Sequence, residues 1–143
     1  LDLNARDGTP MVQLRADQIA QPLDEVVERA AGADRRAAHQ PEGLDDLERM
    51  ERGLRGAVEA AGATLLHIHL HHFTPNGGIS GVAVLAESHI SVHTWPERDY
   101  AAFDIFMCGD ARPELGARVL EETFSPDRTE VVEHRRGRVD DAR

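Results

Sequence analysis

The chain has 143 residues, the size of a single domain that can bury its own hydrophobic core. Its 26 acidic and 16 basic residues give a formal net charge of −10, which argues against a protein that binds a nucleic-acid backbone. The single cysteine excludes an intrachain disulfide, no apolar run has the length of a membrane span, and the first residues lack a signal-peptide core. We therefore expect a cytoplasmic protein without nucleic-acid or membrane partners.

Residues 1–42 form an atypical N-terminal segment that is polar, rich in alanine and weakly patterned. Within it, residues 11–16 could form a strand and residues 22–31 a helix, and residues 32–42 are typical of a solvated loop.

Residues 43–62 predict an amphipathic helix, because apolar side chains recur every three or four positions. These apolar positions are Leu44, Leu47, Met50, Leu54, Val58 and Ala61. Acidic side chains at 45, 46 and 48 suit the first turn of a helix, and Gly62 is a plausible end.

The following residues favour strands, because they are rich in β-branched and apolar residues between turn signals. The predicted elements are strands at 64–73, 79–87, 88–94 and 101–108, a loop at 95–99, a helix from Pro113 to about Phe124, and a short strand at Thr129–Val132. Strands clustered between helices indicate an α+β fold, a two-layer sandwich with a mostly antiparallel sheet and helices on one face.

Four of the eight histidines lie in the run HIHLHH, at His67, His69, His71 and His72. Strand alternation puts the first three on one face of the sheet, where imidazoles could hold zinc or another first-row metal. The chain has no suitably spaced cysteines and no HExxH helix to support such a site. We therefore expect a polar sheet face and predict no metal.

Residues 78–110 concentrate serines, histidines, acids and the single cysteine. A Ser-His-acid hydrolase is disfavoured, because no G-x-S-x-G elbow is present. A nucleophilic pair of Cys108 with His93 or His89 stays open, because their spacing does not show whether they meet.

Residues 85–97, LAESHISVHTWPE, followed by residues 100–109, YAAFDIFMCG, closely resemble the bacterial and archaeal S-adenosylmethionine decarboxylase proenzymes. Residues 73–81 and 131–137 also resemble that family. The likeness runs over residues 43–137, which we take as the decarboxylase core, and residues 138–143 form a tail.

The resemblance implies an enzyme that decarboxylates S-adenosylmethionine to the aminopropyl donor for spermidine biosynthesis. It also implies a zymogen that cuts itself between Glu87 and Ser88, into a β chain of residues 1–87 and an α chain of residues 88–143. Ser88 would become a covalent pyruvoyl group, the cofactor that forms a Schiff base with the substrate.

Further roles follow from the resemblance, residue by residue. His93 would support processing by taking a proton in the elimination step, Ser80 would assist processing, and Cys108 would be the proton donor in decarboxylation. Simple alternation puts Ser88 and His93 on opposite faces of a strand, so their meeting requires a turn or bulge near residues 87–88.

Phe73, Trp95 and Glu97 match positions of the family's substrate pocket. The aromatic rings could stack on adenine and lie against the sulfonium, and Glu97 could accept hydrogen bonds from the ribose. The family also implies a homodimer of processed αβ units with sites near the subunit interface.

Three alternatives remain. The pyruvoyl chemistry could act on another amino acid, ornithine or arginine; the chain could be an unprocessed, non-catalytic paralogue that regulates a partner; or it could be a His-rich metal-binding domain. The N-terminus differs from the family pattern, since Pro10 stands near the place where a first strand begins with a histidine. Either residues 11–16 supply that strand, or the strand is absent.

Overall fold

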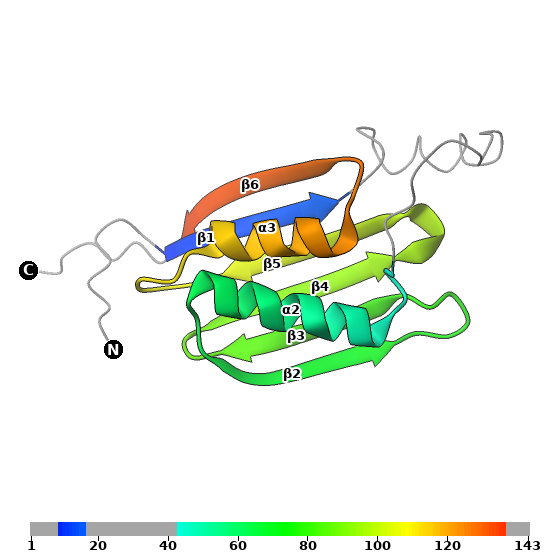
Figure 1. Cartoon of the computed structure of the whole chain (residues 1–143), viewed down its shortest axis with the longest axis horizontal. Coiled ribbons are helices and arrows are strands. Elements are labelled where there is room, and N and C mark those ends of the chain that lie inside the picture. Colours follow the sequence, from blue (N-terminus) through cyan, green and yellow to red (C-terminus); the bar gives the residue numbers. More distant parts are fainter. Residues whose placement is uncertain (1–8, 17–42, 137–143) are drawn as a thin grey trace, which may run out of the picture.

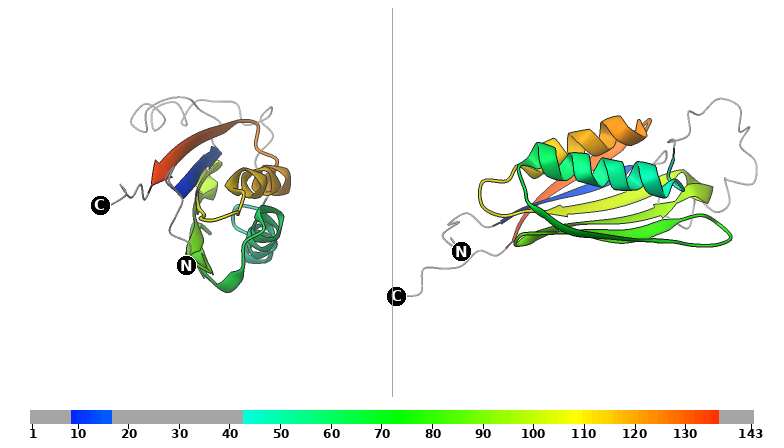
Figure 2. Two further views of the ribbon diagram at one scale, coloured as in Figure 1. Left: turned by 90° about the vertical axis from the view of Figure 1, so that its left-hand side faces the viewer. Right: turned by 60° about the horizontal axis from the view of Figure 1, so that its bottom comes forward.

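The computed structural model describes residues 9–16 and 43–136 and shows a six-stranded sheet with two helices on one face (Figures 1 and 2). The strand order is β2-β3-β4-β5-β1-β6, and every neighbouring pair is antiparallel. This confirms the predicted α+β two-layer sandwich. The elements are β1 (Thr9–Ala16), α2 (Leu47–Ala61), β2 (Leu65–His72), β3 (Ile79–Leu85), β4 (Ser88–Trp95), η1 (Pro96–Arg98), β5 (Tyr100–Phe106), α3 (Pro113–Phe124) and β6 (Thr129–Arg136).

Helix α2 begins at Leu47, so the predicted start at residue 43 was wrong. The carboxylate of Asp46 accepts a hydrogen bond from the backbone N–H of Arg49 at 3.0 Å, which caps the helix. The preceding residues form a turn, closed by the bond from Asp46 N–H to the Gly43 carbonyl at 3.2 Å. The helix ends as predicted at Gly62, whose φ of 74° suits a residue without a side chain.

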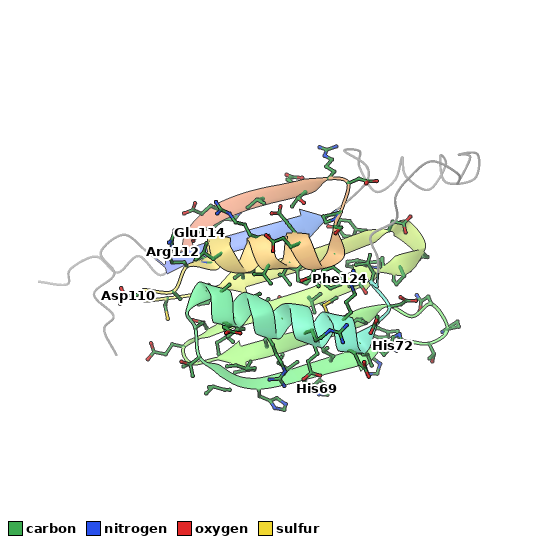
Figure 3. All side chains as sticks on the ribbon, in the orientation of Figure 1. His69, His72, Asp110, Arg112, Glu114 and Phe124 are labelled. Atoms are coloured by element: carbon green, nitrogen blue, oxygen red, sulfur yellow. The ribbon has the colours of Figure 1, made fainter. Side chains whose placement is uncertain are left out.

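Helix α3 occupies the predicted range and packs beside α2 (Figure 1). The Arg49 guanidinium of α2 donates two hydrogen bonds, of 3.1 and 2.9 Å, to the carbonyl of Thr123 near the end of α3. Phe124, labelled in Figure 3, is the last residue of α3. Its ring lies 5.9 Å from that of Phe103 of β5, and both side chains are buried. At the other end, a backbone hydrogen bond, with Arg112 as a smaller contribution, lowers the pKa of Glu114.

The five strands predicted after the first helix are all present, but their bounds differ from the predicted ones. β2 is one residue shorter at each end, β3 ends at Leu85 because residues 86–87 form the turn, and β5 spans Tyr100–Phe106 rather than 101–108. β4 includes Trp95, and the expected loop after it is the short 3-10 helix η1. β6 runs to Arg136 rather than Val132, because it pairs with β1 along its whole length. The polar sequence at its end has no strand signature of its own, so only the neighbouring strand reveals it.

The N-terminal strand β1 lies between β5 and β6 and includes residues 11–16. Its register pairs Met11 with Phe106 on one side and with His134 on the other. Residues 11–16 therefore supply the first strand, and the alternative that this strand is absent was wrong. The predicted helix at 22–31 and loop at 32–42 lie outside the described residues.

Within the described residues, both helices cover the same face of the sheet (Figure 2). Along β4, Ile90, Val92 and Thr94 are buried on the side of the helices. The alternating residues point to the other side, which no helix of the described ranges covers (Figure 2). We call this side the open face; it carries Val82 and Val84 of β3 and His89, Ser91, His93 and Trp95 of β4.

On the helix side of the sheet, Thr94 links β4 to the start of β3 and to the turn before α2. Its hydroxyl accepts a hydrogen bond from the backbone N–H of Ile79 at 2.8 Å and donates one to the carbonyl of Leu44 at 2.7 Å. Thr94 is 6% exposed, so neither backbone partner has ready access to water in its place.

We expect Thr94→Val to destabilise the fold by about 2–4 kcal/mol, because the substitution keeps the side-chain shape and leaves two buried backbone groups unsatisfied. Thr94→Ser keeps the hydroxyl and is the matched control, with an expected loss below about 1.5 kcal/mol for the missing methyl. Urea unfolding followed by circular dichroism measures both. Equal unfolding midpoints for the two variants would contradict this role of the hydroxyl.

Candidate active site

The β3–β4 hairpin has a two-residue link, Ala86–Glu87, with Leu85 opposite Ser88. Glu87 has a φ of 64°, the left-handed region that costs a residue with a side chain about 1–2 kcal/mol. The turn is tied to the chain before β2 by the hydrogen bond from Ala86 N–H to the Thr64 carbonyl at 2.9 Å. The Glu87–Ser88 peptide bond therefore sits in a conformation that the surrounding structure maintains against its local preference.

Cys108 reaches this peptide bond from the residues after β5. Its backbone N–H donates to the Ser88 hydroxyl oxygen at 3.3 Å, and its Sγ lies 3.4 Å from Ser88 Oγ. The thiol also donates to the carbonyl oxygen of Glu87 at 3.3 Å. The Ser88 hydroxyl, the adjacent Glu87 carbonyl and a thiol that donates to that carbonyl are thus brought together within one chain. We call Glu87, Ser88 and Cys108 the hairpin end of the site.

Ser80 and His93 form a second group, at the opposite end of β3 and β4. They are direct partners across the two strands, and Ser80 Oγ lies 2.8 Å from Nδ1 of His93. The rings of Trp95 and His93 are 6.1 Å apart, and Tyr100 lies 5.4 Å beyond Trp95. We call this group the histidine end of the site.

The predicted substrate-binding residues also lie at the histidine end. Phe73 directly follows β2, and its backbone N–H donates to the carbonyl of Gly78 at 2.8 Å, two residues before Ser80. Phe73 and Trp95 are 44% and 39% exposed, so both rings present surface to a ligand or partner. Glu97 is exposed in η1, directly after β4.

Ser88 and His93 do not meet within the chain. The expected turn lies before Ser88, and the register on both sides of β4 is regular, so alternation along the strand is intact. Five residues of strand separate the two side chains by about 16 Å along the sheet, on opposite faces. The structure thus brings Ser88 together with Cys108, and Ser80 together with His93, and keeps the two groups apart.

The histidines of β2 follow the predicted alternation. His67, His69 and His71 stand opposite Val84, Val82 and Ser80 on the open face, and His69 and His72 are labelled on this strand in Figure 3. Among the described residues, no group of histidine, cysteine and acidic side chains could hold a metal ion. Cys108 lies beside Ser88, at the far end of β4 from His93.

The sequence did not predict two features: the buried hydrogen bonds of the Thr94 hydroxyl and the left-handed backbone of Glu87. Thr94 follows His93 in the chain, but its hydroxyl bonds become visible only when Leu44 and Ile79 are in place. The Ser80–His93 contact had a usable signal, since counting outward from a two-residue link at 86–87 makes these two residues partners.

No helix of the described residues is long and apolar enough to cross a membrane. A family model described as S-adenosylmethionine decarboxylase matches residues 35–137.

Curated relatives agree with that match. An S-adenosylmethionine decarboxylase proenzyme of Methanococcus maripaludis strain S2 is 50% identical over 99 residues, covering 68% of this chain and 80% of the relative. One of Thermomicrobium roseum is 46% identical over 99 residues, covering 68% of this chain and 85% of the relative. The crystal structure of the adenosylmethionine decarboxylase from Aquifex aeolicus VF5 superposes with a TM-score of 0.74 at 26% identity, covering 97% of this chain and 98% of that one. On these grounds, the chain belongs to the S-adenosylmethionine decarboxylase family.

Proposed function

We infer that this protein decarboxylates S-adenosylmethionine to the aminopropyl donor for spermidine biosynthesis, after cutting its own chain between Glu87 and Ser88. The observation that carries the self-cleavage is the hairpin end, where Ser88 Oγ and the Cys108 thiol flank the peptide bond. Ornithine and arginine are not favoured as substrates, because the relatives act on S-adenosylmethionine by name. A non-catalytic paralogue is not favoured, because Ser88, His93 and Cys108 are all retained.

Cleavage begins with attack of the Ser88 hydroxyl oxygen on the carbonyl carbon of Glu87. The new C–O bond replaces the C–N bond of the peptide, and the hydroxyl proton passes to the released nitrogen, giving an ester. Negative charge develops on the Glu87 carbonyl oxygen, which already accepts a hydrogen bond from the Cys108 thiol at 3.3 Å. The left-handed backbone of Glu87 raises the energy of the intact turn, and the cut releases that strain.

The ester then opens by loss of the Ser88 α-proton and departure of the Glu87 carboxylate. Hydrolysis of the resulting dehydroalanine consumes water, releases ammonia and leaves a pyruvoyl group at position 88. Serine fits this sequence, because its oxygen serves first as nucleophile and then as leaving group. The proposed products are a β chain of residues 1–87 and an α chain of residues 88–143.

A pyruvoyl group at position 88 would supply a ketone that holds the substrate amino group and accepts the electrons released with CO2. Decarboxylation next requires a proton donor, and the 3.4 Å distance between Cys108 Sγ and the Ser88 oxygen supports Cys108 in this role. A thiol proton is available near neutral pH and responds to its surroundings. We propose that Cys108 protonates the substrate carbon after CO2 leaves.

The elimination step needs a base within hydrogen-bond reach, and we propose that His93 of a second copy supplies it. Within one chain, His93 is about 16 Å from Ser88 along β4, which is too far for proton transfer. A second copy packed on the open face, with its strands running in the opposite direction, would bring its histidine end over this hairpin end. Because the Ser88 side chain lies on the other face of β4, the partner's His93 would approach the Ser88 α-carbon at the end of the sheet, beside the Ala86–Glu87 turn. Exposed Val84, Trp95 and Phe73 supply apolar area for such a contact. The proposed enzyme is thus a homodimer of processed αβ units, with each site completed by both copies.

The histidine end would also bind the substrate. We propose that the exposed rings of Phe73 and Trp95 stack on adenine and contact the sulfonium, a cation–π interaction of about 0.5–2 kcal/mol. Glu97 follows Trp95 after one residue, so its carboxylate can accept hydrogen bonds from the ribose and attract the cationic substrate. The free thiol of Cys108 must stay reduced for its role, which suits the cytoplasm.

The test is the intact mass of the freshly purified protein under denaturing conditions, together with CO2 release from carboxyl-labelled S-adenosylmethionine. We expect two fragments divided between Glu87 and Ser88, with a pyruvoyl rather than a serine at the new N-terminus, and labelled CO2. A single full-length mass after long incubation would contradict the self-cleavage. CO2 from ornithine or arginine in place of S-adenosylmethionine would overturn the proposed substrate.

A further inference from the structure

His71 lies in a row with the residues of the histidine end. It stands directly opposite Ser80 in the β2–β3 ladder, and Ser80 stands directly opposite His93 in the β3–β4 ladder. Residues paired in this way share one face of a sheet, so the three side chains form a line across the open face. The chemistry assigned above to this end uses Ser80 and His93 and leaves His71 without a role.

The described contact of His71 is with Phe73. The two ring centroids are 4.5 Å apart, and the ring planes are inclined by 70°, an edge-to-face arrangement. This is a favourable geometry for aromatic pairs, and it orients one ring with respect to the other. His71 belongs to β2, whereas Phe73 lies just beyond the end of that strand. The backbone position of His71 is therefore fixed by the strand, and its ring can orient the ring of Phe73.

The backbone of Phe73 is held while its side chain remains accessible. Its N–H donates to Gly78 at 2.8 Å, and its carbonyl accepts from Gly77 at 3.0 Å. The side chain is nevertheless 44% exposed, and the two backbone hydrogen bonds do not by themselves fix its rotamer. The ring of His71 supplies an edge-to-face contact that favours one orientation of the Phe73 ring.

We propose that His71 is a positioning residue, which holds the ring of Phe73 in the orientation that receives the adenine of the substrate. This inference rests on the proposed function, because it takes Phe73 as part of the substrate pocket. His71 acts through packing, so any flat ring of similar size at position 71 can replace it. It contributes to substrate affinity and not to self-cleavage or to the chemical step.

The test compares His71→Ala with His71→Phe in the full chain, measuring KM and kcat for S-adenosylmethionine and the extent of cleavage by intact mass. We expect His71→Ala to raise KM about 3- to 10-fold, the size of one lost aromatic contact, with kcat within about two-fold and complete cleavage. His71→Phe is expected to restore KM to within about two-fold of the wild-type value, because it supplies an equivalent ring. His67→Ala is the matched control, since His67 shares the strand and the face but stands opposite Val84, away from Phe73.

Several results would overturn the proposal. An unchanged KM in His71→Ala, or a loss of cleavage that His71→Phe does not restore, would show that His71 does not act by orienting Phe73. Phe73→Ala separates this failure from failure of the proposed pocket. If Phe73→Ala raises KM and His71→Ala does not, the pocket stands and the positioning role falls; if Phe73→Ala also leaves KM unchanged, Phe73 is outside the pocket.

Discussion

Ser88→Ala is expected to yield a full-length chain whose decarboxylase activity is lower by at least about 1,000-fold, because the proposed nucleophile and source of the pyruvoyl group is gone. In the proposed mechanism, the hydroxyl oxygen of Ser88 both attacks the Glu87 carbonyl and leaves in the elimination. The substitution removes the two contacts of the hydroxyl with Cys108 and creates no clash, so the fold should persist. Intact mass, CO2 release and circular dichroism together measure cleavage, activity and folding.

Ser91→Ala is the matched control for this prediction. Ser91 is on the same strand and is half-buried, but it lies on the open face opposite Asp104 and Val82. We expect it to cleave fully and to retain activity within about three-fold, as is usual for substitutions away from special features. Cleavage of Ser88→Ala between residues 87 and 88 would mean that another group performs the attack.

Co-expression of Ser88→Ala with His93→Ala is expected to restore activity that neither variant has alone. In a mixed dimer, Ser88 of one chain meets His93 of the other at one of the two sites, and the second site carries both defects. Random pairing makes half of the dimers mixed, so the recovered activity should be about a quarter of the wild-type level. The mass spectrum gives a sharper readout, since only the chain that carries His93→Ala should be cut.

Ser88→Ala with Cys108→Ala is the control pair, because both substitutions affect the same end of the site. The 3.4 Å contact joins Ser88 and Cys108 within one chain, so no arrangement of these two variants produces a complete hairpin end. We expect no recovery of decarboxylation. If the His93→Ala chain stays intact in the first mixture, the two ends do not combine across copies, and the proposed dimeric site is wrong.

Periodicity predicted the elements that carry their own pattern. The apolar steps of α2 and α3 and the alternation of β2, β3 and β4 are local signals, and the elements lie where those signals put them. The start of α2 was placed too early because Leu44 continues the apolar pattern, although it packs in the core from a turn before the helix. The polar end of β6 was missed because its partner β1 lies more than a hundred residues away in the chain.

The contacts of the site can likewise be separated into those that a local sequence pattern predicts and those that depend on distant parts of the chain. The pairing of Ser80 with His93 depends on one short link and was within reach of a sequence argument. The contact of Ser88 with Cys108 depends on how the chain leaves β5, and the contact of Thr94 with Leu44 spans 50 residues. Contacts of this kind are set by the packing of several elements together, which periodicity does not describe.

The position of β1 has a consequence for the cut enzyme. A break between Glu87 and Ser88 leaves β1, α2, β2 and β3 in one fragment and β4, β5, α3 and β6 in the other. Because β1 is inserted between β5 and β6, and β3 pairs with β4, the fragments are interlocked and cannot separate without dismantling the sheet. Before the cut, covalent linkage gives these segments a high effective concentration for one another, and afterwards that advantage is lost. If the chain is cut as proposed, it folds as one polypeptide and acts as two. Unfolding after the cut is then hard to reverse, and the lifetime of the mature enzyme is set by its rate of unfolding.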